Sequence, residues 1–205
     1  MKILNHAALG AALLLFPAVA HSETWTIDTP HSSAQFSVRH MMISNVKGEF
    51  TKVTGTVDLD ESDITRSKVE ATIDATTIDT REPKRDAHLK SPDFFDVAKY
   101  PAITFKSTSV ARGSDGRLKV AGDLTMHGVT KQVVLDVDPV SAPIKDRSGA
   151  LHAGTSATTK IKRKDFGITY NSALETGGVM IGDEVSIMID VELVKRPAAP
   201  GGGSN

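Results

Sequence analysis

The stretch TREPKRDAHLKSPDFFDVAKYPAITF, residues 80–105, stands apart from the strand and turn patterns that fill most of the chain. Pro83 suits the first turn of a helix, where its missing N–H loses no partner, and residues 84–90 are reasonable helix formers. Pro92 then ends the helix. The stretch therefore predicts a short helix within a crossover at about 81–96, which would form the lid of an otherwise all-β body.

Two adjacent phenylalanines, Phe94 and Phe95, follow this helix and need apolar cover. The mouth or the interior of a β-barrel would supply that cover. A surface crossover that the two rings hold against the core is the alternative, and the stretch alone does not decide between them.

Outside this stretch, apolar and polar residues alternate with the period of two that is typical of strands. The clearest examples are residues 34–39, 69–74 and 185–193. The further candidates, which bring the total to about nine strands, are residues 24–28, 48–59, 103–110, 118–126, 129–138 and 151–161. His127 and Gly128 fit a two-residue hairpin loop. Many sequential antiparallel strands, each with one apolar face, favour an all-β closed barrel or sandwich.

Small residues occupy several of the apolar strand faces. They are Ala71, Ala75, Gly122, Ala153 and Ala157. These positions would leave space in the centre of a barrel if they point inward, whereas a barrel built only for stability would be filled with larger groups. The predicted helix could fill the same space instead.

Both ends of the chain differ in composition from the body. Residues 1–20 contain one cation, Lys2, then an apolar run and a small-x-small ending, which predicts a cleavable secretory signal peptide. Residues 21–196 are then expected to form one domain. Residues 197–205, PAAPGGGSN, are rich in proline and glycine and are predicted to be a disordered tail.

Charge and cysteine content narrow the classes of function. The 24 lysines and arginines nearly balance the 25 aspartates and glutamates, which argues against a broad basic surface for nucleic acid. The chain has no cysteine, so thiol chemistry and disulfides are excluded.

The sequence predicts no metal and no required cofactor. A calcium loop that would begin at Asp58 fails, because Asp63 stands where glycine is needed. The histidines show no close metal-ligand spacing, although distant residues could converge in the fold. His31 follows Asp28 in an expected turn and is assigned to local hydrogen bonding.

Six motifs follow one another along the chain: WTIDTPHSSAQFSVRH (25–40), KGEF (47–50), RDAHLKSPDFFD (85–96), YPAITFKS (100–107), GDLTMHGVTK (122–131) and KRKDFGI (162–168). In this order they resemble the YceI-like family of secreted bacterial proteins. The resemblance runs from about Trp25 to Leu193. It implies an extended, lipocalin-like antiparallel β-barrel in the periplasm, with an apolar interior for a long isoprenoid or similar lipid. It implies no established catalytic reaction.

The residues expected to line such an interior are apolar and mostly aromatic. They are Phe36, Val38, Phe94, Phe95, Phe105 and Phe166. Alternation places His40 on the same side of its strand as Phe36 and Val38, where it could approach a head group. Ordinary core packing is the alternative for the apolar residues, and a structural hydrogen bond is the alternative for His40.

Arg85, His88 and Arg163 are the candidate donors to a lipid head group. Arginine offers a planar fork to phosphate oxygens, and histidine can donate a hydrogen bond. The alternative is local pairing, of Arg85 with Asp86 or Asp93 and of Arg163 with the nearby Asp165.

Three classes of function remain. The first is a periplasmic, non-catalytic binding or carrier protein for an isoprenoid quinone or polyprenyl phosphate, with transient membrane contact during lipid exchange. The second is an enzyme that acts on a lipid head group through His40 or His88. The third is a stress-related protein-interaction module. An edge strand could also pair two chains into a homodimer, but the sequence identifies no such edge.

Overall fold

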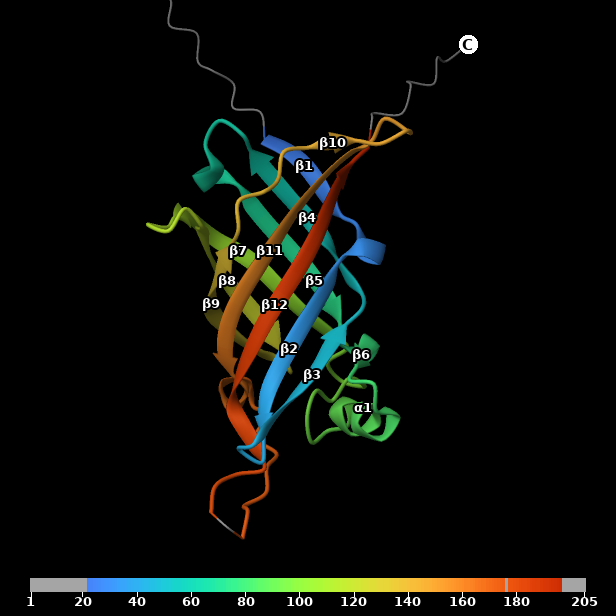
Figure 1. Ribbon diagram of the computed structural model, residues 1–205, viewed down its shortest axis with the longest axis vertical. Coiled ribbons are helices and arrows are strands. Elements are labelled where there is room, and N and C mark those ends of the chain that lie inside the picture. Colours follow the sequence, from blue (N-terminus) through green and yellow to red (C-terminus); the bar gives the residue numbers. More distant parts are fainter. Residues whose placement is uncertain (1–21, 176, 197–205) are drawn as a thin grey trace, which may run out of the picture.

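The computed structural model describes residues 22–175 and 177–196, which form an elongated barrel of antiparallel strands (Figure 1). The predicted signal peptide and the predicted tail lie outside the described residues. The strands are β1 Ser22–Ile27, β2 Ser33–His40, β3 Ser44–Phe50, β4 Val53–Asp60, β5 Lys68–Asp74, β6 Ile78–Asp79, β7 Ala102–Arg112, β8 Leu118–Met126, β9 Val129–Val137, β10 Ile144–Lys145, β11 Leu151–Lys162 and β12 Ile181–Lys195. The helices are α1 Pro83–Lys90 and the 3-10 turns η1 Thr29–His31, η2 Ile64–Arg66, η3 Ala75–Thr77 and η4 Arg163–Phe166. Among the described residues, no helix has the length and apolar character needed to cross a membrane.

Eight of the strands close into a ring of antiparallel pairs. The order around the ring is β11, β9, β8, β7, β5, β4, β1 and β12, and β12 pairs back to β11 over residues 184–195. Closure gives every strand of the ring a partner on both sides, so the ring itself has no open edge. The barrel that the strand pattern allowed is thus confirmed, and a sandwich is not formed.

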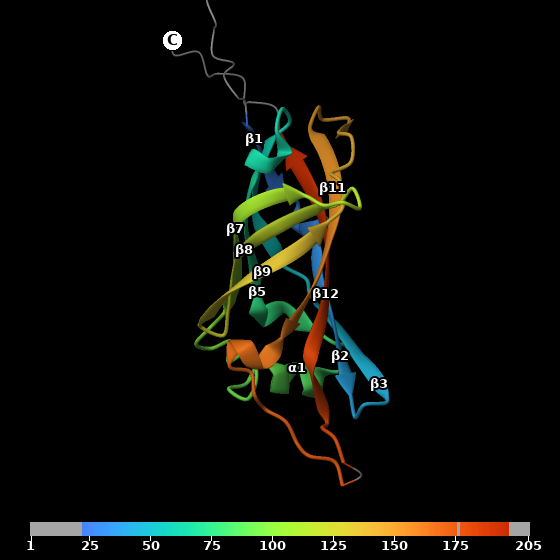
Figure 2. The same ribbon diagram turned by 90° about the vertical axis from the view of Figure 1, so that its left-hand side faces the viewer.

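The wall continues beyond the ring towards the end covered by α1 (Figures 1 and 2). On one edge of β12, residues 193–194 pair with β1 and residues 181–190 pair with β2. Only the η1 turn separates β1 from β2. Because both pair along the same edge of β12, they behave as one bent strand. Strands β3 and β6 extend the wall in the same direction.

The single strand predicted at residues 48–59 is wrong, because the chain bends after Phe50 and forms β3 and β4. Phe50 and Val53 are both buried although they are three positions apart. A continuous strand would place them on opposite faces. The bend resets the alternation, and both side chains face the interior.

The predicted helix and crossover are confirmed. Helix α1 begins at Pro83, and the side chain of Glu82 caps it by accepting a hydrogen bond from the N–H of Lys84. It ends at Lys90, with Ser91 as the C-cap residue directly before Pro92. The proline signals therefore set both ends of the helix.

The predicted hairpin at His127 and Gly128 is also confirmed. Met126 pairs with Val129, and the two residues between them have φ angles of 52° and 75°. A two-residue turn with both φ angles positive matches the twist of the flanking strands. A Cβ atom on Gly128 would lie 2.5 Å from Cε1 of Tyr100, so this close approach also requires glycine.

The end of the barrel that holds β1 and the end of β12 is packed with apolar side chains. Trp25 is completely buried there, and Leu193 is 1% exposed. Trp25 Nε1 is the one buried side-chain nitrogen or oxygen among the described residues without a hydrogen-bond partner. The indole therefore contributes to the core by its volume rather than by its polar group.

Replacing Trp25 by alanine should lower the free energy of unfolding by about 3–5 kcal/mol, because it leaves a cavity in this packed end. Trp25→Phe is the matched control, since it keeps most of the volume and removes an unpartnered N–H; its cost should stay below about 1.5 kcal/mol. Urea denaturation followed by far-ultraviolet circular dichroism measures both. Equal losses in the two variants would contradict this role for the indole.

Candidate functional site

An elongated cavity of about 420 Å³ occupies the interior of the barrel. This volume lies within the range of small-molecule sites, roughly 300–1,000 Å³. Side chains of β12 line it from Ile181 to Leu193, which corresponds to about 40 Å of extended strand. A cavity that is so long for its volume suits a chain-like molecule better than a compact one.

Apolar side chains that alternate along the strands form nearly all of the lining. On β12 and β8 these are Val185, Ile187, Ile189, Val191, Leu193, Leu118, Val120, Leu124 and Met126. The inward series that the alternation at residues 185–193 predicted is confirmed. The even-numbered neighbours on β12, among them Ser186, Asp190 and Glu192, point to the outer wall.

Two of the five small residues leave space in the interior as expected. Ala71 and Ala157 line the cavity. Ala75 and Ala153 are buried in the core but do not line it. The ring of Phe105 covers Gly122, so this glycine provides room for an aromatic side chain rather than for a ligand.

The lid, defined as α1 and the residues that follow it up to Tyr100, closes one end of the cavity. Phe95 of the lid meets Phe50 of β3 edge to face, with ring centroids 5.5 Å apart. Phe50 lies 5.9 Å from Phe36 of β2. All three rings line the cavity, so this aromatic row joins the lid to one wall.

A second aromatic cluster joins the lid to the segment after β11. The rings of His88, Phe94 and Tyr170 have centroids 4.9–5.1 Å apart, and all three line the cavity. His88 Nε2 also lies 2.8 Å from Asp93 Oδ2 within the lid. The two phenylalanines of the lid thus hold the crossover on the barrel and form part of the cavity wall, which combines the two alternatives that the sequence left open.

Arg85 is a half-buried cation at this end of the cavity. Its Nε donates to Thr80 Oγ1 at 2.8 Å, and its Nη2 donates to the carbonyl oxygen of Thr80 at 2.9 Å. The local pairing considered for it is not formed, since Asp86 accepts from Thr80 and Asp93 contacts His88. Among the described residues, Nη1 of Arg85 has no hydrogen-bond partner, so it can still donate to a ligand.

Arg163 also lines the cavity, but its donors are engaged by the backbone. Nε donates to the carbonyl oxygen of Gly182 at 2.9 Å, and Nη1 donates to those of Ile168 and Tyr170 at 2.9 and 2.8 Å. The alternative, local pairing of Arg163 with Asp165, is not formed. Burial lowers the pKa of the Arg163 guanidinium. In this geometry, Arg163 holds the segment after η4 in place.

The structure brings nine of the ten candidate residues to the cavity lining. They are Phe36, Val38, His40, Arg85, His88, Phe94, Phe95, Phe105 and Arg163. Phe166 is the exception and needs correction: it is 1% exposed but lies outside the lining. It belongs to η4, where the strand alternation has ended, and its carbonyl oxygen lies 3.1 Å from His127 Nδ1.

Sequence reasoning missed Arg39, Tyr170 and Met180, which also line the cavity. Alternation places Arg39 on the outer face, but the pairing of β2 with β12 shifts register between Ile181 and Val185, next to this residue. Tyr170 and Met180 lie in an irregular segment without periodicity. Only its residue type could have pointed to Tyr170, because tyrosine is rare in this chain, which has two.

The comparisons with known proteins agree with this geometry. The model of the YceI-like domain family matches residues 25–193. A UPF0312 protein of Vibrio cholerae is 39% identical over 165 residues, which are 80% of this chain and 87% of that protein. The crystal structure of a Campylobacter jejuni YceI protein superposes with a TM-score of 0.64 at 33% identity, covering 77% of this chain and 90% of that one.

A third similarity extends only to the fold. It is to a polyisoprenoid-binding domain from Saccharophagus degradans, with a TM-score of 0.59 at 17% identity over 84% of this chain and 98% of that domain. The family match, by contrast, spans nearly the whole barrel, from within β1 to near the end of β12, and includes the lid. The chain belongs to the YceI-like domain family.

Proposed function

We propose that this protein is a periplasmic binding or carrier protein for a long-chain isoprenoid lipid, whose tail occupies the barrel cavity. The observation that carries the proposal is the cavity itself, which is long, apolar and continuous along β12. A structural neighbour with the same fold is described as a polyisoprenoid-binding domain. The periplasmic location rests on the signal-peptide pattern at residues 1–20.

The energetics of burial explain why the ligand should have a long tail. Each buried methylene-sized group contributes about 0.8 kcal/mol gross, whereas association and ordering cost about 4–15 kcal/mol. A net gain of about 0.3 kcal/mol per atom gives roughly 1.5 kcal/mol, or about tenfold in affinity, for the five carbons of each prenyl unit. Affinity should therefore rise with chain length until the cavity is full.

The head group is expected at the lid, where the arginine and histidine side chains of the lining gather. Arg39, His40, Arg85 and His88 line this end, and Arg85 retains a free donor among the described residues. These donors suit a head group that accepts hydrogen bonds, as the carbonyls of a quinone and the oxygens of a polyprenyl phosphate both do. Titration with a quinone and a phosphate of equal chain length distinguishes them.

In the Ala157→Phe variant, affinity should stop rising at a shorter isoprenoid chain length than in the native protein, because the new ring fills part of the cavity. Thr158→Phe is the matched control, since it adds the same ring to the next position of β11, on the outer wall. Equilibrium dialysis against a series of isoprenoid quinones of increasing chain length measures the affinity. An identical chain-length dependence in Ala157→Phe and the native protein would count against a tail in this cavity.

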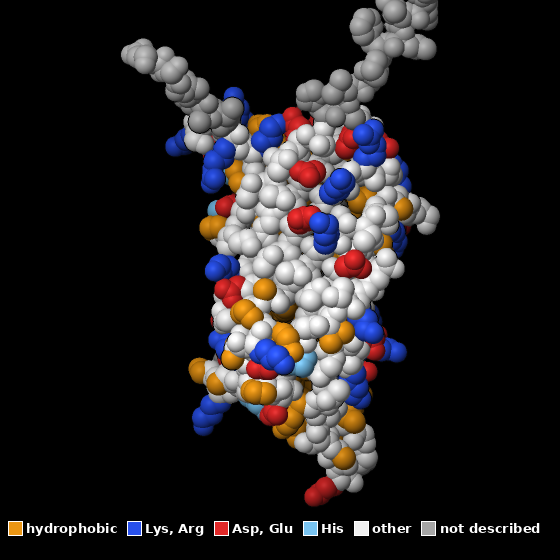
Figure 3. All heavy atoms as spheres, turned by 180° about the vertical axis from the view of Figure 1, so that it is seen from behind, with side chains coloured by type: hydrophobic (Ala, Val, Ile, Leu, Met, Phe, Trp, Pro, Cys, Tyr) orange, Lys and Arg blue, Asp and Glu red, His pale blue; other side chains and the backbone are white. Residues whose placement is uncertain are grey.

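An exposed apolar surface adjoins the lid end and supports transient membrane contact. This tip patch consists of Met41, Met42, Ile43 and Val179, and Ile43 is 76% exposed. Figure 3 shows hydrophobic side chains gathered at this end of the molecule. The N–H of Met41 donates to the carbonyl oxygen of Met180, which lines the cavity, so the patch lies directly beside the lining. Exposed patches of this kind commonly mark membrane or protein contacts.

Ile43→Asp should slow the uptake of a quinone from phosphatidylethanolamine and phosphatidylglycerol vesicles by at least about tenfold, because burial of an isoleucine contributes about 1.5–3 kcal/mol. Its equilibrium affinity for the quinone in detergent-free solution should stay the same. Ile144→Asp is the matched control, since Ile144 is 72% exposed on β10 at the opposite end. If uptake slowed equally in both variants, the tip patch would have no specific role in lipid exchange.

A further inference from the structure

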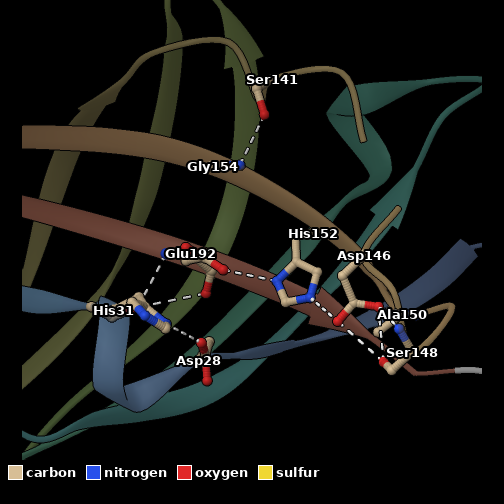
Figure 4. A network of polar contacts seen from close by, with 10 residues as sticks. Asp28, His31, Ser141, Asp146, Ser148, Ala150, His152, Gly154 and Glu192 are labelled. Carbon is tan, nitrogen blue, oxygen red and sulfur yellow. Dashed lines mark hydrogen bonds and ion pairs between the residues drawn. The ribbon is translucent and has the colours of Figure 1, made fainter. Parts of the chain in front are cut away.

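Imidazole and carboxylate groups gather on the outer wall of the barrel, across β12 from the cavity (Figure 4). Asp28 and His31 come from the η1 turn, Glu192 from β12, His152 from β11, and Asp146 from the segment before β11. One donor atom each of Asp28, His31 and Glu192 lies within 4.8 Å of the other two. His31 Nδ1 is 2.6 Å from Asp28 Oδ2. The fold thus joins side chains that are far apart in the sequence.

His152 connects this group to a further carboxylate. Its Nδ1 lies 2.8 Å from Glu192 Oε1, and its Nε2 lies 3.2 Å from Asp146 Oδ2. Asp146 is itself fixed, because it accepts hydrogen bonds from the N–H groups of Ser148 and Ala150. The Glu192 carboxylate is therefore held in place from the side opposite the η1 turn.

The backbone holds the η1 turn against β12 at Glu192. The N–H of Asp28 donates to the carbonyl oxygen of Glu192 at 2.8 Å, and the N–H of Glu192 donates to the hydroxyl of buried Ser32 at 3.1 Å. Pro30 restricts the turn, and the N–H of His31 donates to the carbonyl oxygen of Asp28. The cluster is thus positioned by the backbone before any ligand arrives.

The charge of the cluster favours a cation. Three carboxylates, those of Asp28, Asp146 and Glu192, face the imidazoles of His31 and His152. A divalent ion would supply positive charge among these carboxylates.

We propose that Asp28, His31 and Glu192 bind a divalent transition-metal ion, with His152 positioning the Glu192 carboxylate. Imidazole nitrogen and carboxylate oxygen are usual ligands of Zn²⁺, and three protein ligands leave one position for water. Ca²⁺ and Mg²⁺ prefer oxygen ligands, so the imidazole of His31 favours zinc over them. A hydrogen bond from a second residue to a ligating carboxylate is the usual support for such a site.

This metal site is separate from the lipid cavity and does not depend on the proposed function. Glu192 faces the outer wall, whereas Val191 and Leu193 on either side of it line the interior. A bound ion would fasten the η1 turn to β12, where the wall passes from β1 to β2. Because such an ion binds only the folded protein, it should also raise the midpoint of thermal unfolding.

Titration of the mature protein, prepared without a polyhistidine tag, with Co²⁺ and Zn²⁺ tests the proposal. Co²⁺ should give a saturable visible absorption at one ion per chain that Zn²⁺ removes and Mg²⁺ does not. His31→Ala should lose this absorption, and His152→Gln should weaken binding by about 10–100-fold. His88→Gln is the matched control, since His88 also contacts a carboxylate, Asp93, but lies in the lid.

Circular dichroism confirms that each variant is folded before titration. Glu192→Gln is an independent test and should also weaken metal binding, because it removes the charge of a ligand and leaves the backbone contacts of the η1 turn intact. The absence of saturable binding by the native protein would overturn the proposal. Equal binding by the native protein and the His31→Ala and Glu192→Gln variants would overturn it as well, because the ion would then be held elsewhere.

Discussion

The closed ring of main-chain hydrogen bonds is the constraint on which the rest of the structure depends. It gives each strand two partners, so the wall can persist around an interior that its side chains do not fill. Unfilled volume is costly: at about 24 cal/mol per Å³, an empty and dry cavity of this size would cost on the order of 10 kcal/mol. An apolar tail in the 420 Å³ cavity would offset that cost. On the proposed function, lipid binding would therefore stabilise the barrel.

The two ends of the barrel differ, and this difference would give a bound lipid one direction. Trp25 and its neighbours pack the end at β1 with large apolar groups. The other end carries the lid, the polar lining residues around Arg85, and the tip patch beside them. A tail would point towards Trp25, and a head group would remain where hydrogen-bond donors and the apolar surface meet. Glu192 lies on the outer wall, away from the cavity and the tip patch, so the proposed metal ion would bind separately from the lipid.

Local chemistry determined what could be predicted from the sequence. The lining of β12 followed from period-two alternation, and Pro83 and Pro92 set the ends of α1, because each signal acts over a few residues. The prediction failed where tertiary structure resets a local pattern, as at the bend after Phe50 and in η4, which removes Phe166 from the lining. Of the outer-wall cluster, the sequence indicated only the local turn that holds Asp28 and His31. Glu192 and His152 join these two residues only when β11, β12 and the η1 turn come together.

The most direct test of lipid binding is mass spectrometry of the organic extract from the mature protein, purified from a bacterial periplasm without detergent. If the cavity holds an isoprenoid, the extract should contain one isoprenoid lipid in near-stoichiometric amount, and its head group would identify it as a quinone or a phosphate. An extract without an enriched lipid, from folded protein that also fails to take up isoprenoids from vesicles, would contradict lipid binding in this cavity.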